Sequence, residues 1–127
     1  MATVELTEQT FGDVLAKDGI TIIDFWAAWC GPCRQFAPIF EDASERHSDI
    51  RFAKVDTEAN QNLAGGLGIT SIPTLMVVRD GVLLFNQAGA LPGPVLEDLI
   101  EKVKDLDMDA IRAEIAEQQA SAATETE

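Results

Sequence analysis

The two cysteines of this chain stand three residues apart where a predicted strand meets a predicted helix, and they constrain the fold more than any other feature. The apolar run of residues 20–26 precedes them and is typical of a buried strand. After Cys33, apolar side chains recur at helical spacing as far as Ala43. The pattern therefore predicts a strand that delivers Cys30 to the start of a helix.

A helix start favours the thiolate form of Cys30. Unpaired backbone N–H groups and the positive end of the helix dipole stabilise an anion at this position. We therefore expect Cys30 to ionise more readily than a free cysteine. Cys33 would lie one helical turn further in, where it can attack a mixed disulfide that Cys30 has formed. This arrangement predicts a dithiol–disulfide exchanger.

Three other roles for the cysteine pair stay open at this point. A zinc site needs about four ligands, and His47 is the only histidine, so we expect no metal. A structural disulfide across so short a loop would stabilise the fold by roughly 2 kcal/mol before strain is subtracted. Two inert buried thiols also fit, although the Gly-Pro pair between the cysteines is typical of a sharp turn into a helix.

Length and composition indicate one globular domain. The chain has 127 residues, of which 46% are hydrophobic, and no apolar run is long enough to span a bilayer. Residues 1–5 lack the basic and apolar segments of a signal peptide, so we expect a cytoplasmic protein. In that compartment a vicinal thiol pair is more often catalytic than structural. The net charge of −13 argues against nucleic acids and anionic membranes as partners.

The negative charge is concentrated in residues 97–127, which hold ten acids and three bases, whereas the preceding 96 residues hold twelve acids and six bases. Only three apolar side chains follow helical spacing near the end of the chain, and they would anchor a helix weakly: Met108, Ile111 and Ile115. We predict a domain of residues 1–106 and an acidic C-terminal tail of residues 107–127, part helical and, from Ser121, part mobile.

The remaining pattern alternates strands and helices. Strands are expected at residues 4–6, 20–26, 50–55, 74–78 and 82–85. Helices are expected between residues 7 and 19, after Cys30, from a cap at Thr57 through Leu63, and around residues 96–103. Asp80-Gly81 between two apolar runs predicts a tight hairpin. This order predicts an α/β fold whose central mixed five-stranded sheet carries helices on both faces.

Asp24 interrupts an otherwise apolar strand. Burial of a carboxylate costs several kcal/mol unless the group is paired or its pKa rises. From the residues alone, a buried Asp24 and an Asp24 at an exposed end of the strand are equally compatible with the pattern. Lys54, in the strand of residues 50–55, is likewise compatible with a solvated lysine.

Several of these residues together resemble the thioredoxin family, over about residues 4–104. The matching residues are Asp24, Trp26, Trp29-Cys30-Gly31-Pro32-Cys33, Pro38, Lys54, Ile72-Pro73-Thr74 and Gly89. The resemblance implies a thioredoxin fold and a general protein-disulfide reductase, an electron donor to reductive enzymes. Gly-Pro between the cysteines resembles the reducing members of the superfamily, whereas protein disulfide isomerases and glutaredoxins carry other dipeptides there.

The resemblance also implies roles for single residues. Cys30 would be the exposed nucleophile and Cys33 the shielded resolving thiol, with Asp24 as a buried proton acceptor and donor near Lys54. Pro73 would be the family's cis-proline. Trp26 would support the site, and the following residues would bind substrate, with the Ile72 backbone paired to an extended segment: Trp29, Gly31, Pro32, Ile72, Pro73, Ala88 and Gly89.

The resemblance further implies a monomer with no bound cofactor, reduced by NADPH through thioredoxin reductase. Ribonucleotide reductase, peroxiredoxins and methionine sulfoxide reductases are family-level examples of its clients. Two alternatives remain on the sequence alone. A binding module would keep its function without cysteines, and an oxidant or isomerase would need a less reducing dithiol.

Overall fold

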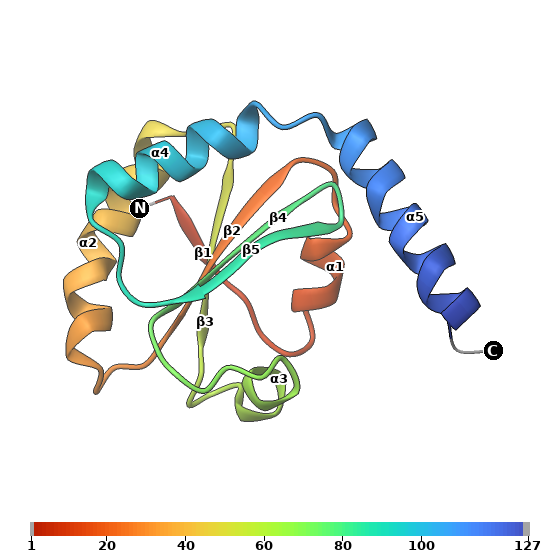
Figure 1. Cartoon of the computed structure of the whole chain (residues 1–127). Coiled ribbons are helices and arrows are strands. Elements are labelled where there is room, and N and C mark those ends of the chain that lie inside the picture. Colours follow the sequence, from red (N-terminus) through yellow and green to blue (C-terminus); the bar gives the residue numbers. More distant parts are fainter. Residues whose placement is uncertain (1, 126–127) are drawn as a thin grey trace.

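The computed structural model describes residues 2–125 and contains ten elements (Figure 1). The first nine follow the order that the sequence predicts, and the tenth is a helix in the C-terminal tail, which was expected to be part helical. The strands are β1 (Thr3–Glu5), β2 (Ile20–Trp26), β3 (Arg51–Asp56), β4 (Thr74–Arg79) and β5 (Val82–Ala88). The helices are α1 (Phe11–Leu15), α2 (Gly31–Arg46), α3 (Gln61–Gly66), α4 (Gly93–Lys104) and α5 (Met108–Glu125).

The five strands form one mixed sheet in the order β1-β3-β2-β4-β5. β3 pairs in parallel with both β1 and β2, while β4 pairs antiparallel with β2 and β5. β2 therefore lies in the middle of the sheet, and its side chains are buried on both faces, as expected for a continuous apolar run. The predicted mixed sheet is confirmed.

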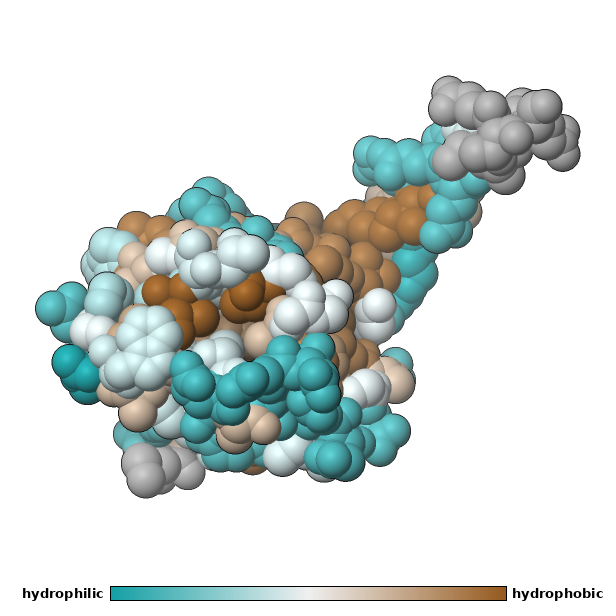
Figure 2. Space-filling model, turned by 90° about the horizontal axis from the view of Figure 1, so that it is seen from below, coloured by the Kyte–Doolittle hydropathy of each residue, from teal (hydrophilic) through white to brown (hydrophobic). Residues whose placement is uncertain are grey.

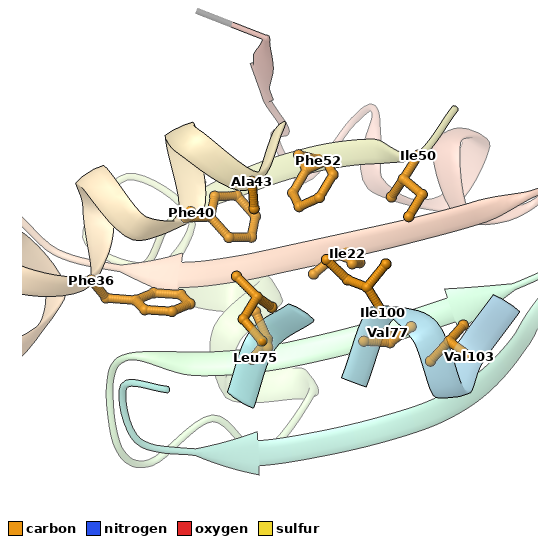
Figure 3. Close-up of a cluster of buried hydrophobic side chains, with 11 residues drawn as sticks. Ile22, Phe36, Phe40, Ala43, Ile50, Phe52, Leu75, Val77, Ile100 and Val103 are labelled. Atoms are coloured by element: carbon orange, nitrogen blue, oxygen red, sulfur yellow. The ribbon is translucent and has the colours of Figure 1, made fainter. Parts of the chain in front are cut away.

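Alternation along β2 sends consecutive side chains to opposite faces. Ile22 packs with α2 and α4, and Ile23 packs with α1 and α3. Figure 3 shows the first cluster, in which side chains from α2 and α4 meet three strands: Ile22, Phe36, Phe40, Ala43, Ile50, Phe52, Leu75, Val77, Leu96, Ile100 and Val103. The second cluster contains Leu6, Phe11, Ile23, Phe25, Ala53, Val55, Met76 and Val78. Helices thus cover both faces, as predicted.

The hairpin between β4 and β5 turns at Asp80 and Gly81, as the sequence predicts. Both residues have positive φ, 52° and 80°, which suits the twist of adjoining strands. Asp80 also accepts a hydrogen bond from the Gly19 N–H at 2.7 Å, which ties the turn to the start of β2. β5 runs three residues further than expected, to Ala88.

The helix expected from Thr57 begins later, because a turn follows β3. The N-cap of α3 is Asn60, and the Thr57 hydroxyl instead donates to the Trp26 carbonyl at 3.1 Å. The Asp56 carboxylate accepts from the Glu58 N–H at 2.9 Å and organises that turn. The predicted cap at Thr57 is therefore wrong.

α5 follows α4 after a short turn and extends away from the sheet (Figures 1 and 2). Arg79 at the end of β4 donates to the Val103 carbonyl at 2.8 Å, and Arg112 lies 3.5 Å from the Asp80 carboxylate. Met108 is buried, which the sequence did not lead us to expect. The helix continues through Glu125, so residues 121–125, expected to be mobile, are helical, while residues 126–127 lie outside the described part.

Membrane insertion would need a helix that is both long and apolar. Among residues 2–125, no helix combines the length and the apolar composition that crossing a bilayer requires.

Candidate active site at the start of helix α2

The loop after β2 delivers Cys30 to the N-cap of α2. Cys30 has an extended backbone, and its sulfur accepts a hydrogen bond from the Cys33 N–H at 3.2 Å. The Cys30 carbonyl accepts the first helical hydrogen bond, from Arg34 at 3.1 Å. Pro32 stands in the first helical turn, where its missing N–H leaves no helical hydrogen bond unmade. The predicted junction of strand and helix is confirmed, and it points a backbone donor at the first sulfur.

The two cysteines form a disulfide. In this form Cys30 is only 4% exposed and Cys33 2% exposed, so the expectation of an exposed Cys30 is wrong for the disulfide state. Ala27 completes their buried cluster, and Trp26 and Ile72 pack against it. The two sulfurs differ less in burial than in surroundings, because Cys30 alone caps the helix.

A second segment lies directly beside Cys30. The Ile72–Pro73 peptide is cis, as the resemblance implied, and the Ile72 carbonyl oxygen is 3.7 Å from the Cys30 sulfur. Gly89 donates its N–H to the Pro73 carbonyl at 2.8 Å and has a φ of +112°, a conformation that other residues rarely adopt. The sheet places Ala88 opposite Thr74, next to this contact.

These residues lie at the end of the sheet where α2 begins. Figure 2 views the molecule from below and shows a hollowed apolar patch framed by paler and more hydrophilic residues. Ala88 and Gly89 are exposed and Ile72 is half-buried, so this face offers backbone and apolar side chains to a partner. The structure thus brings together residues from three distant parts of the sequence.

Trp29 projects from the same end of the molecule and is 67% exposed. Its indole N–H donates to the Glu58 carboxylate at 2.8 Å, which fixes the ring in place. Arg34 donates to the Ala28 carbonyl at 2.8 Å and braces the loop from the other side. Neither Glu58 nor Arg34 is among the site residues that the sequence predicts. For Glu58 there was a usable signal, since neighbouring parallel strands bring the loops that follow them to the same sheet edge.

Asp24 is buried inside the sheet, which decides between the two placements left open by the sequence. Its exposed fraction is 0%, and neither carboxylate oxygen has a hydrogen-bond partner among the described residues. Burial raises the pKa of Asp24 to about 7; the charge of Lys54 lowers it by less, and that of Glu5 raises it. Asp24 alternates with Phe25 and so faces the α2 side of the sheet, as Ile22 does.

Lys54 stands opposite Asp24 on β3 and is half-buried, not fully solvated. Its ammonium lies over the Trp26 ring, 4.9 Å from the ring centroid, a distance that allows cation–π attraction. Trp26 is therefore in contact with both the cysteine cluster and the lysine. Its own indole N–H is buried without a hydrogen-bond partner among residues 2–125.

Metal ligands do not cluster in the part of the chain that the structure describes. No group of three or more His, Cys, Asp or Glu side chains there could hold a metal ion. His47 lies at the far end of α2 from the cysteines, where its ring nitrogen is 2.7 Å from the Glu97 carboxylate.

Comparison with known proteins identifies this architecture. The sequence model of the Thioredoxin family matches residues 2–105, most of the chain. The chain belongs to the thioredoxin family. A thioredoxin-type protein of Streptomyces coelicolor is 52% identical over 121 residues, which cover 95% of this chain and 90% of that protein. The thioredoxin of Bacillus subtilis is 39% identical over 103 residues, with 80% and 98% coverage.

Solved thioredoxin structures share the fold as well. A mutant thioredoxin from Halobacterium salinarum superimposes with a TM-score of 0.75 at 34% identity, and the match covers 83% of this chain and 93% of that one. A Plasmodium falciparum thioredoxin gives a TM-score of 0.71 at 32% identity, with 79% and 97% coverage. This thioredoxin-family chain is accordingly a thiol–disulfide oxidoreductase, a protein-disulfide reductase that works through the Cys30–Cys33 pair.

Proposed function

We propose that Cys30 attacks the client disulfide and that Cys33 resolves the complex. The Cys30 thiolate forms a bond to one client sulfur while the client S–S bond breaks and the other sulfur leaves as a thiolate. The Cys33 thiolate then bonds to Cys30, which breaks the mixed disulfide and releases the second client sulfur. The client gains two electrons and two protons, and the protein ends as the Cys30–Cys33 disulfide.

The observation that carries this assignment is the position of Cys30 at the N-cap of α2. The Cys33 N–H already donates to the Cys30 sulfur, and a thiolate there accepts the same hydrogen bond with a full negative charge. The helix dipole adds to this stabilisation. Cys33, inside the first turn, has no comparable position, so its role is to attack its neighbour.

Cys33 has to lose a proton before it attacks, and Asp24 is the group suited to accept it. Asp24 faces the side of the sheet that α2 covers. Because its pKa is about 7, both its protonated and ionised forms are populated near neutral pH. A proton acceptor is most effective when its pKa lies near the working pH.

Client segments would bind in extended form across the end of the sheet. The Ile72 backbone, next to the Cys30 sulfur, would pair with such a segment as an added strand does. The remaining surface would be supplied by the exposed Trp29, Pro32, Ala88 and Gly89 and the half-buried Gly31. Pro73, which the resemblance also assigns to substrate binding, is buried and would contribute by placing the Ile72 carbonyl. Trp29, held by Glu58, would shield the disulfide and contact the client.

The oxidised pair has to be reduced again, for which a thioredoxin reductase that draws electrons from NADPH is the matching donor. Clients would include reductive enzymes that end each cycle with a disulfide, such as ribonucleotide reductase, peroxiredoxins and methionine sulfoxide reductases. The bacterial thioredoxins among the relatives support the thiol–disulfide chemistry, and we propose a cytoplasmic location. We propose a monomer without a bound cofactor.

Single-cysteine variants test the two roles. Cys33→Ser should still attack but lose the resolving step, so mixed disulfides with client proteins should accumulate and survive non-reducing electrophoresis. Cys30→Ser should form no such adducts, and both variants should lose insulin reduction with NADPH and a thioredoxin reductase. Adducts formed by Cys30→Ser alone would reverse the assignment.

A variant without either cysteine separates reduction from binding. If the variant Cys30→Ser/Cys33→Ser keeps the biological role of the protein, the groove acts as a binding module and the redox chemistry is incidental. Loss of that role, with the fold retained by circular dichroism, supports the reductase.

A further inference from the structure

Three charged side chains form a row across the sheet on the face that α2 covers. The register places Glu5 of β1 opposite Lys54 of β3, and Lys54 opposite Asp24 of β2. Thr3, two residues before Glu5, donates to Glu41 of α2 at 2.8 Å. Because alternate residues of a strand share a face, Glu5 also lies on the face that α2 covers. Neighbouring strands lie about 4.8 Å apart, so Glu5 and Asp24 are separated by roughly 10 Å with Lys54 between them.

Lys54 interacts electrostatically with both Glu5 and Asp24 without forming a close ion pair with either. Among the described residues, no carboxylate oxygen lies within 4.0 Å of its ammonium, which rests over the Trp26 ring. It is therefore balanced between a carboxylate at the sheet edge and a buried carboxylate, both of which it attracts. Such a cation shifts toward whichever side gains negative charge or loses a competitor.

We propose that Glu5 is a positioning residue that competes with Asp24 for the charge of Lys54 and so leaves Asp24 incompletely compensated. The inference rests on the proposed role of Asp24 as the proton acceptor. Glu5 touches neither cysteine and acts through Lys54. It thereby sets the pH range in which Asp24 exchanges its proton.

Other side chains on this face of the sheet also contribute to the electrostatic environment of Glu5 and Asp24. Charged neighbours come from β3, which carries Asp56 beside Lys54, and from α2, which carries Glu41. β4 and α4 contribute apolar side chains: Leu75, Val77, Leu96, Ile100 and Val103. Glu5 is exposed at the edge, yet partial burial raises its pKa more than Lys54 lowers it.

Removal of the Glu5 charge therefore acts on Asp24 twice in the same direction. The repulsion between the two carboxylates ends, and Lys54 is free to approach Asp24. Both changes stabilise the ionised form of Asp24 and lower its pKa. For charges about 10 Å apart near a surface, a decrease of roughly half a pH unit is expected.

The test is an NMR titration of the Asp24 carboxyl in the full-length oxidised protein, in which Cys30 and Cys33 do not titrate. Glu5→Gln should lower the Asp24 midpoint by roughly half a pH unit. Glu5→Asp, which keeps the charge, should restore most of the original midpoint. Asp13→Asn is the matched control, because it removes an exposed acid from α1, which covers the opposite face, and should change nothing. An unchanged midpoint in Glu5→Gln overturns the proposal.

Repeating the titration in a Lys54→Met protein separates an effect of Glu5 through Lys54 from direct repulsion between Glu5 and Asp24. In Lys54→Met, the effect of Glu5→Gln on the Asp24 midpoint should shrink by at least half. An equal effect in both backgrounds would mean that Glu5 acts through space and not through Lys54, which overturns the positioning role.

The pH profile of insulin reduction then distinguishes this inference from the proposed function. In Glu5→Gln the profile should move to lower pH by the same amount as the Asp24 midpoint. If the midpoint moves while the profile stays, the positioning role of Glu5 stands and the proton role of Asp24 fails. A profile that moves while the midpoint stays overturns the positioning role.

Discussion

The two faces of the sheet are built from the same strands, but they serve different purposes. The face under α1 and α3 is packed by apolar side chains such as Phe25 and Val55. The face under α2 and α4 has an equally apolar centre, yet toward the cysteines it carries Asp24 and Lys54. Both faces stabilise the fold, but the face under α2 and α4 also buries a titratable carboxyl, which lowers its net contribution to stability.

The physical reason lies in the alternation of β2. Because consecutive side chains point to opposite faces, a single strand can bury Phe25 on one side and Asp24 on the other. The buried aromatic contributes favourable transfer free energy. The buried carboxyl lacks hydrogen-bond partners among the described residues, and it is tolerated because its pKa is raised.

The largest expected change in stability concerns the apolar face. Phe25 is fully buried, and its ring lies 6.3 Å from that of Phe11. Phe25→Ala should lower the free energy of unfolding by about 3–5 kcal/mol, since it removes an aromatic ring and leaves a cavity. Urea denaturation followed by tryptophan fluorescence should give the same loss at pH 5 and pH 8. A loss that changes strongly with pH would mean that the two faces are not independent.

The second expected change has the opposite sign and depends on pH. In the unfolded chain Asp24 ionises near its ordinary pKa of 3.8, whereas in the folded protein it stays protonated until about pH 7. The stability that the folded protein gains from binding a proton at Asp24 is thus fully present below pH 3.8. This part of the free energy of unfolding is lost as the pH rises to about 7. Asp24→Asn removes this loss and should stabilise the oxidised protein by about 2–4 kcal/mol at pH 8.

At pH 4 the same variant should have nearly the stability of the parent protein, because a protonated aspartate and an asparagine are both neutral. Insulin reduction by Asp24→Asn should be slower, and its dependence on pH near 7 should weaken. Equal stability of both proteins at pH 8 would contradict a raised pKa at Asp24. An unchanged rate would contradict its proton role alone.

The smallest expected change concerns α5, which belongs to neither face. A chain that ends after Ala110 keeps the buried Met108 and loses the ion pair between Arg112 and Asp80. Because exposed ion pairs are weak, its free energy of unfolding should fall by less than about 1 kcal/mol. A chain that ends after Asp107 should lose roughly 1–2 kcal/mol more, since Met108 leaves its buried position. Thermal unfolding of both chains compares them directly, and both should keep full insulin reduction.

A larger loss in the first truncation would show that Ile111 and Ile115 contribute to the core. Both side chains are half-buried, so a loss above about 1 kcal/mol would show that α5 packs on the domain through them. A loss of insulin reduction in either truncation would give the C-terminal helix a part in the chemistry.

The sequence by itself determined the local features. Apolar runs placed the strands, Asp80-Gly81 marked the hairpin, and the spacing of Cys30 and Cys33 after β2 located the disulfide and its chemistry. These features depend on neighbouring residues, so a linear pattern carries them. The cap of α3 was misplaced because hydrogen bonds of Asp56 and Trp26, made outside the helix, delay its start.

Only the tertiary structure decided what lies beside the disulfide. Strand pairing brings Ile72 and Gly89 next to Cys30. Glu58 meets Trp29 because β3 and β2 are parallel, so the loops that follow them lie at the same edge of the sheet. Whether Asp24 was buried also depended on α2 covering that face, which no residue of β2 encodes. The row that joins Glu5, Lys54 and Asp24 exists because three strands align in one register, and register is a property of the assembled sheet.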